Sequence, residues 1–252
     1  MTDKIAFITG ADRGLGRSMA THLSSAGIGI VGTYFKNEEQ AAKVSREIGD
    51  VGGTAVMLQL DLGNSATFQP FMAALAKALR KSFGRDDLDF VVQNAGNGVL
   101  GSTDKMTGDE LDSLYRVHLK RPFLLNQLLI PLIKRGGRII NVSSAGTRFY
   151  LKGHGPYSAL KGAVEVVTLY MAKELGDRQI TVNIVAPGAI ETDFAGGEVR
   201  DDKALNRMFA EATPLGRVGL PDDIGAAVTA LLSEDMGWLN GQRIEISGGQ
   251  SL

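Results

Sequence analysis

The 252-residue sequence predicts an α/β protein built on a doubly wound, seven-stranded parallel sheet with helices on both faces. Short apolar runs alternate with longer stretches of helical periodicity, which is the pattern of parallel strands joined by crossover helices. The runs are continuously apolar, as expected for strands that are buried on both faces. Many of the 32 glycines lie where a run ends, and ligands bind at the strand ends of such sheets.

The predicted elements follow one another along the whole chain. The strands cover residues 5–9, 28–34, 55–60, 89–93, 138–142, 181–186 and 243–246. The helices cover residues 14–26, 38–48, 66–83, 110–134, 157–175, 203–211 and 222–232. Residues 188–202 have small side chains and no clear period, which predicts a mobile loop entering a short helix. No repeat, low-complexity tract or linker divides the chain, so we expect one domain over residues 1–252.

Composition excludes several classes of function. The net charge of −1, with basic residues spread along the chain, argues against nucleic acid or an anionic membrane as a partner. The absence of cysteine excludes disulfides and thiol chemistry, and no histidines have the spacing of a metal site. No apolar run approaches the ~20 residues of a membrane span, and residues 1–4 lead into the first strand without a secretory signal. We therefore expect a soluble, cytoplasmic protein that binds no metal.

A glycine-rich turn links the first predicted strand to the first helix. Gly10 permits the tight turn, while Gly14 and Gly16 let the backbone approach a pyrophosphate at the positive end of the helix. The spacing is G-x-x-x-G-x-G rather than G-x-G-x-x-G, and a turn that needs glycine only for its geometry is the alternative. The place of the turn, at the first strand–helix junction, favours a dinucleotide site in a Rossmann fold.

The end of the second predicted strand bears on the choice of cofactor. An NAD site has a carboxylate about 20 residues past the glycines, to bind the ribose 2′-hydroxyl. Here that position is Lys36, after Tyr34, and Arg13 lies within the glycine loop. Two cations favour a 2′-phosphate, and hence NADP over NAD. Asp12, close to the proposed phosphate, is evidence against this, as are two glutamates at positions typical of a helix's first turn.

Three further residues form a pattern that can transfer a proton. Tyr157 and Lys161 are four residues apart in a predicted helix and therefore share one face. A nearby ammonium can lower the pKa of a tyrosine from ~10 by ~1–3 units, which makes it a better acid near neutral pH. Ser144, after the fifth strand, would hydrogen-bond the same substrate oxygen. An exposed surface pair is the alternative, and only the coincidence with Ser144 and the glycine loop argues against it.

Several segments in this order make the chain resemble the short-chain dehydrogenase/reductase family over its whole length. The fingerprint T-G-x-x-x-G-x-G matches residues 9–16, and the catalytic spacing of the family matches Ser144, Tyr157 and Lys161. The other matching segments are residues 61–62, 93–96, 187–192, 214–217 and 241–249.

The resemblance implies a set of residues that contact the cofactor. Lys161 would also bind the nicotinamide ribose, and the segment from Pro187 to Thr192 would bind the carboxamide. With the residues predicted from spacing, the cofactor-binding set is Gly10, Asp12, Arg13, Gly14, Leu15, Gly16, Tyr34, Lys36, Asp61, Leu62, Asn94, Ala95, Gly96, Tyr157, Lys161, Pro187, Gly188, Ile190 and Thr192. The resemblance further implies a homotetramer built through the two long helices and the C-terminus.

Two positions depart from the family pattern. Gln93 replaces the first asparagine of the N-N-A-G segment, and His118 occupies the place of the asparagine that completes the catalytic tetrad. His118 is either a structural residue of an apolar helix or part of a proton relay to Lys161.

These patterns predict an NADP-dependent reductase of a carbonyl compound, most similar to reductases of 3-oxoacyl thioesters and related ketones. Two alternatives stay open. One is a sugar, polyol or other alcohol dehydrogenase; the other is a non-catalytic NADP-binding regulator, for which Gln93 and His118 are the motive. The substrate pocket is expected from residues 96–100, 145–155 and the loop after Gly188.

Overall fold

The structure, a computed structural model, describes residues 4–252 and contains one parallel sheet of seven strands. The strand order β3-β2-β1-β4-β5-β6-β7 reverses direction between β1 and β4, as the doubly wound prediction requires. The strands are β1 (Ile5–Ile8), β2 (Gly29–Tyr34), β3 (Ala55–Gln59), β4 (Leu88–Gln93), β5 (Ile133–Val142), β6 (Thr181–Pro187) and β7 (Arg243–Ile246).

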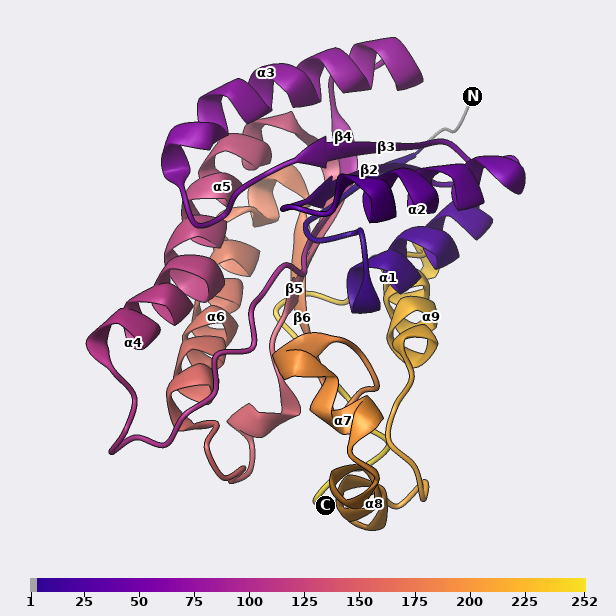
Figure 1. The fold of residues 1–252 in the computed structure, drawn as a ribbon. Helices are drawn as coiled ribbons and strands as arrows, with labels where there is room; N and C mark the ends of the chain where they lie inside the picture. The colour runs from indigo at the N-terminus through magenta and orange to yellow at the C-terminus, as the bar shows by residue number, and fades with distance from the viewer. Residues whose placement is uncertain (1–3) are drawn as a thin grey trace.

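Helices cover both faces of this sheet (Figure 1). One face carries α1 (Gly14–Ser25), α2 (Glu38–Asp50) and α9 (Pro221–Leu231). The other carries α3 (Phe68–Ala78), α5 (Arg121–Leu129) and α6 (Gly155–Glu174), with α4 (Gly108–Tyr115) leading into α5. Two short helices, α7 (Glu198–Asp201) and α8 (Lys203–Glu211), project beyond the carboxyl ends of the strands, near the C-terminus (Figure 1).

The sheet separates two hydrophobic cores, because successive side chains on a strand point to opposite faces. On β1, Phe7 packs against Phe71 of α3, with the ring centroids 5.9 Å apart. The next residue, Ile8, belongs to the opposite core with Met19 of α1 and Val228 of α9. Both side chains of β1 are fully buried, which explains why the strands read as continuous apolar runs.

The predicted helix over residues 110–134 is wrong in its extent and its regularity. A π-helical turn at Arg116–Lys120 separates α4 from α5, and the N–H of Arg121 donates to the carbonyl of Arg116, five residues back. Pro122 gives the reason, since it has no N–H to donate to the carbonyl of His118. The helical segment ends at Leu132, and residue 134 belongs to β5.

Smaller differences affect two other predicted segments. The helix predicted over residues 66–83 begins at Phe68, and its last turn, Leu79–Phe83, widens before a left-handed Gly84 with a φ of 67°. The predicted loop after Gly188 contains a short turn, Phe194–Gly197, before α7. The residues used to argue against a signal peptide include 1–3, which lie outside the described part. Within residues 4–252, no helix has both the length and the apolar character needed to cross a bilayer.

Candidate active site

The predicted site residues converge at the carboxyl edge of the sheet, around the switch point between β1 and β4. Gly10 follows β1, Asn94 follows β4, Ser144 follows β5, and Gly188 follows β6. Helix α6 brings Tyr157 and Lys161 to the same edge, where both are buried. The fold therefore brings together the two patterns that the sequence places more than 100 residues apart.

The glycine loop has a shape that side chains would prevent. Gly10 and Gly14 have φ values of 66° and 53°, which disfavour any residue with a Cβ atom. A Cβ atom on Gly16 would lie 1.9 Å from the carbonyl oxygen of Gly10. Helix α1 begins here with no capping side chain and no acidic residue in its first turn. Its first N–H groups are therefore available to an anion, and the loop fits a dinucleotide pyrophosphate.

Side chains from three strands fix the position of this loop. The amide of Asn94 donates to the carbonyls of Thr9 at 3.0 Å and Gly10 at 3.2 Å. The hydroxyl of Thr9 accepts the N–H of Asn94 at 2.9 Å and that of Ala95 at 3.0 Å, and Thr33 of β2 accepts the N–H of Gly10 at 3.0 Å. The sequence assigned Asn94 directly to the cofactor and gave no role to Thr9 or Thr33. The sequence feature that could have identified them is a threonine at the carboxyl end of a strand next to the loop, Thr9 after β1 and Thr33 in β2.

The region expected to contact a 2′-phosphate contains two exposed cations. Arg13 directly precedes α1, and Lys36 follows β2, with its Nζ 4.9 Å from the ring centroid of Phe35. The glutamates that argue against NADP lie in the first turn of α2, behind an Asn37 cap that accepts the N–H of Gln40. Burial raises the pKa of Asp12 above its ordinary value.

Tyr157 and Lys161 lie on one face of α6. The expectation that the Lys161 ammonium lowers the pKa of Tyr157 is wrong for the chain without its cofactor. Burial raises the pKa of Tyr157 above its ordinary value. Lys161 Nζ donates to the carbonyl of Val142 at 2.8 Å and lies 5.7 Å from the centroid of the tyrosine ring. Burial also lowers the pKa of Lys161 to about 8. The phenol is therefore protonated at neutral pH, as a proton donor must be.

Ser144 is held in an extended conformation at the start of a short turn. Its Oγ accepts the N–H of Gly146 at 3.2 Å, and its φ and ψ are −155° and 145°. The turn that it starts, Ala145–Thr147, is packed between α6 and β7.

His118 lies in the π-helical turn and touches the catalytic tyrosine. Its ring stands edge-on to that of Tyr157, with the centroids 5.2 Å apart, and only 3% of its surface is exposed. Its Nε2 lies 2.9 Å from both the main-chain and the side-chain oxygen of Asn97, and 3.4 Å from the main-chain nitrogen of Asn97. The two shorter contacts favour the tautomer with the proton on Nε2, which leaves a lone pair on Nδ1. Burial, reinforced by the charge of Lys161, lowers the pKa of His118 to about 3, so the ring is neutral.

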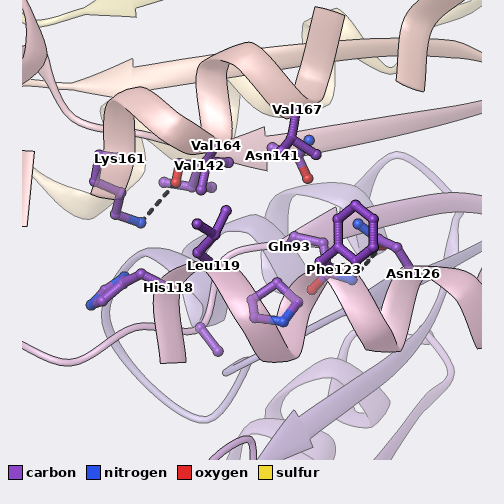
Figure 2. Close-up of a pocket in the computed structure, with 12 residues that line it drawn as sticks. Gln93, His118, Leu119, Phe123, Asn126, Asn141, Val142, Lys161, Val164 and Val167 are labelled. Carbon is purple, nitrogen blue, oxygen red and sulfur yellow. Dashed lines mark hydrogen bonds between the residues drawn. The ribbon is translucent and has the colours of Figure 1, made fainter. Parts of the chain in front are cut away.

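A small cavity lies beside His118 and Lys161 (Figure 2). Its volume is about 20 Å³, enough for a single water molecule. His118 and Lys161 both line it, and His118 Nδ1 has no hydrogen-bond partner among the described residues. Figure 2 also shows the Lys161–Val142 hydrogen bond and the contact between Gln93 and Asn126, at 2.7 Å, in the cavity wall.

The segment after β6 closes the site from the other side. Thr192 lies 3.7 Å from the position that a Cβ atom on Gly14 would occupy, so this segment reaches the glycine loop. The ring of Phe194 packs on that of Tyr157, with centroids 5.6 Å apart. Ile190 pairs with Gly219 through a β-bridge. Tyr34 is the last residue of β2, and Asp61 and Leu62 lie just beyond the end of β3. Residues 4–252 contain no cluster of acidic and histidine side chains that could hold a metal ion.

Comparison with known proteins agrees with this architecture. The family model described as Enoyl-(Acyl carrier protein) reductase matches residues 10–251. A probable tetrahydroxynaphthalene reductase of Zymoseptoria tritici is 37% identical over 97% of this chain and 93% of its own length. The chain belongs to the short-chain dehydrogenase/reductase family and is an oxidoreductase.

Two solved structures superpose on the chain with a TM-score of 0.94. One is LugOII, a promiscuous reductase that catalyses keto-reduction at C1 during lugdunomycin biosynthesis, at 36% identity over 100% of this chain and 99% of that one. The other is LanV, an angucycline C-6 ketoreductase with bound NADP, at 34% identity over 99% and 96%. Ketone reduction is the activity that these relatives share, and the predicted cofactor is the one that LanV binds.

Proposed function

We propose that this protein uses NADPH to reduce a ketone on a fused-ring aromatic molecule. The observation that carries the proposal is the buried pair of Tyr157 and Lys161 at the same sheet edge as a glycine loop that has no room for side chains and leaves the first N–H groups of α1 available to an anion. The loop would bind the pyrophosphate, and Arg13 with Lys36 would bind the 2′-phosphate. When bound, the reduced nicotinamide supplies the hydride.

The chain's own residues would supply the proton. The hydroxyl of Tyr157 donates it to the carbonyl oxygen, and the hydroxyl of Ser144 donates a hydrogen bond to the same oxygen. The phenolate that results is buried, so a nearby positive charge is needed to stabilise it. Lys161 provides that charge, because a pKa of about 8 keeps its ammonium protonated at neutral pH. Its contact with Val142 uses only one of its three N–H groups.

We propose that His118 serves a proton relay in its neutral form. With a pKa of about 3 the ring cannot act as a cationic acid at neutral pH, but Nδ1 can accept a hydrogen bond. A water in the adjoining cavity would accept from Lys161 and donate to Nδ1, so that His118 would hold in place the water through which a proton returns to Lys161 after each reduction. His118→Ala is expected to lower turnover and shift its pH profile; a profile identical to that of the parent would exclude the relay.

The walls of the site favour a flat substrate. Phe194 and His154, which are both partly exposed, place rings beside Tyr157 at centroid distances of 5.6 and 6.5 Å. Offset and edge-on stacking would favour an aromatic substrate over a sugar. The relatives support this choice, since one is described as a tetrahydroxynaphthalene reductase and another as an angucycline ketoreductase.

We also propose that residues 1–252 act as one domain within a cytoplasmic homotetramer. Large apolar side chains are exposed on α4, α5 and α6, on the face that Figure 1 shows away from α1 and α9. They are Leu111, Tyr115, Phe123, Val166, Leu169 and Tyr170. Light scattering of the parent and of Tyr170→Glu tests the assembly, and a monomeric parent would refute it.

The substrate proposal is tested by measuring NADPH and NADH oxidation with three kinds of carbonyl compound. The panel contains hydroxylated naphthalenone and anthraquinone ketones, a 3-oxoacyl thioester and keto sugars. We expect NADPH to be consumed fastest with the fused-ring ketones. Faster turnover of the thioester would restore the substrate class that the sequence favours, and binding of NADPH without any turnover would favour the regulator.

A further inference from the structure

Glu165 is a carboxylate that the proposed mechanism does not use. It lies on α6 four residues after Lys161 and therefore one turn along the same face. Its Oε1 accepts from three donors: the hydroxyl of Ser143 at 2.6 Å, the hydroxyl of Thr147 at 2.7 Å and Nε of Arg243 at 2.9 Å. Its side chain is 22% exposed. Three donors therefore fix one oxygen of this partly buried carboxylate in place.

These donors flank Ser144 on both sides. Ser143 precedes it, and Thr147 ends the short turn that it starts. The main-chain oxygen of Ser144 lies 2.9 Å from the Thr147 hydroxyl and 3.4 Å from Nη2 of Arg243. Arg243 Nη2 also donates to the Thr147 hydroxyl at 3.0 Å. Thr147 and Arg243, the two side chains that contact the main-chain oxygen of Ser144, therefore both contact Glu165 as well.

The same carboxylate joins two parts of the fold that come from distant sequence. Arg243 lies on β7, 78 residues after Glu165, and its Nη1 also contacts Glu245 at 3.1 Å. Glu245 in turn accepts two hydrogen bonds of 2.8 Å from Arg148, the residue after the Ser144 turn. A chain of alternating acidic and basic side chains therefore links helix α6, the Ser144 turn and the edge strand β7.

We infer that Glu165, together with Arg243, positions Ser144 relative to Tyr157. Tyr157 and Lys161 are rigidly placed by α6, whereas Ser144 lies on an irregular turn whose position must be set separately. Glu165 grows from the same helix and is bonded to both sides of that turn, so it keeps the serine and tyrosine hydroxyls at a constant separation. Glu165 is a positioning residue, because its contacts reach the reacting groups only through the turn.

The inference rests on the proposed role of Ser144, and a double-mutant cycle on the holoenzyme tests it. The variants are Ser144→Ala, Glu165→Ala and their combination, with kcat and the KM for NADPH measured on the best ketone. Loss of a hydrogen-bond donor to the developing charge is expected to lower kcat about 10²-fold in Ser144→Ala. Glu165→Ala is expected to lower kcat about tenfold, with the KM for NADPH unchanged. Adding it to Ser144→Ala is expected to change kcat less than about twofold, because no serine remains to be positioned.

Two more variants separate positioning from stability. Glu165→Gln retains an oxygen that accepts from Ser143 and Thr147, so it is expected to recover most of the lost turnover and to fold even where the alanine variant does not. Glu47→Gln, in the half-buried Arg17–Glu47 pair with its 2.8 Å contact, is the matched control and leaves kcat unchanged.

The outcomes are distinct. The inference would be overturned if Glu165→Ala lowered kcat by the same factor in the parent and in the Ser144→Ala variant. A Glu165→Ala variant with the kcat of the parent would also overturn it. A Ser144→Ala variant with full activity would instead refute the proposed role of the serine, and the inference with it.

Discussion

The glycine loop and the proton-transfer site lie at the same edge of the sheet, but different kinds of atoms determine their shapes. In the glycine loop, backbone atoms approach so closely that a methyl group on Gly16 would overlap the carbonyl of Gly10. Around Tyr157, buried side chains set protonation and position through burial, ring contacts and hydrogen bonds. Changes in the first region should therefore act through steric overlap and cofactor affinity, and changes in the second through turnover and its pH dependence.

The largest effect is expected in the glycine loop. In Gly16→Ala the added Cβ atom would lie 1.9 Å from the Gly10 carbonyl oxygen, and relief of that overlap displaces the loop. Overpacking of this kind costs about 1–3 kcal/mol of stability, and we expect NADPH affinity to fall at least about 10²-fold with it. Gly49→Ala in α2 is the control, since nothing lies within 4 Å of its Cβ position. It should raise the free energy of unfolding by about 0.5–1 kcal/mol. Calorimetry and fluorescence titration would measure both, and retention of full NADPH affinity in Gly16→Ala would contradict the steric account.

In the second region, His118 should make the free energy of unfolding depend on pH. The pKa of His118 is about 3 in the folded chain and about 6.5 when unfolded, so between these values the unfolded chain binds a proton that the folded chain does not. The contribution of His118 to stability is therefore lost as the pH falls through 6.5, by about 1.4 kcal/mol per pH unit. His118→Asn should lack this slope. Urea denaturation of both proteins between pH 7 and 4 measures the difference, and parallel curves would mean that folding does not lower the pKa of His118.

A tenfold effect is expected at the cation that would bind the 2′-phosphate. Lys36→Ala removes a charge-assisted hydrogen bond worth about 1.5–3 kcal/mol, so the KM for NADPH should rise about tenfold or more while that for NADH stays constant. Lys43→Ala, on the exposed side of α2, should change neither constant. Steady-state kinetics with both cofactors measure the ratio. A parallel rise for NADPH and NADH would place Lys36 away from the 2′ position.

The smallest effect is expected at the ring that covers Tyr157. Phe194→Ala removes a ring contact worth about 0.5–1.5 kcal/mol, so the KM for a fused-ring ketone should change by about two- to tenfold. Phe194→Tyr keeps the ring and should behave as the parent does. If both variants have the parental KM, Phe194 does not contact the substrate.

The two regions also differ in how far the sequence predicts them. The strands, the glycine loop and the Tyr157–Lys161 face follow from local pattern, because continuous apolar runs and a four-residue helical spacing are visible over short distances. The long helix was wrong in its regularity because Pro122 has no N–H to donate to the carbonyl of His118, and in its extent because β5 begins at Ile133. The cluster at Glu165 could not be found, since Arg243 is 78 residues away and no spacing rule joins a helix to the edge strand. The pKa of Tyr157 depends on burial, which only the folded chain defines.

The central claim is that the Tyr157 hydroxyl is the proton donor for ketone reduction beside a bound nicotinamide. Tyr157→Phe removes that hydroxyl while the ring still fills its place against His118 and Phe194. Pre-steady-state oxidation of bound NADPH by the ketone should slow by about 10²–10⁴-fold in this variant, with the affinity for NADPH unchanged. Oxidation at the rate of the parent would show that the proton comes from another group and would contradict the account.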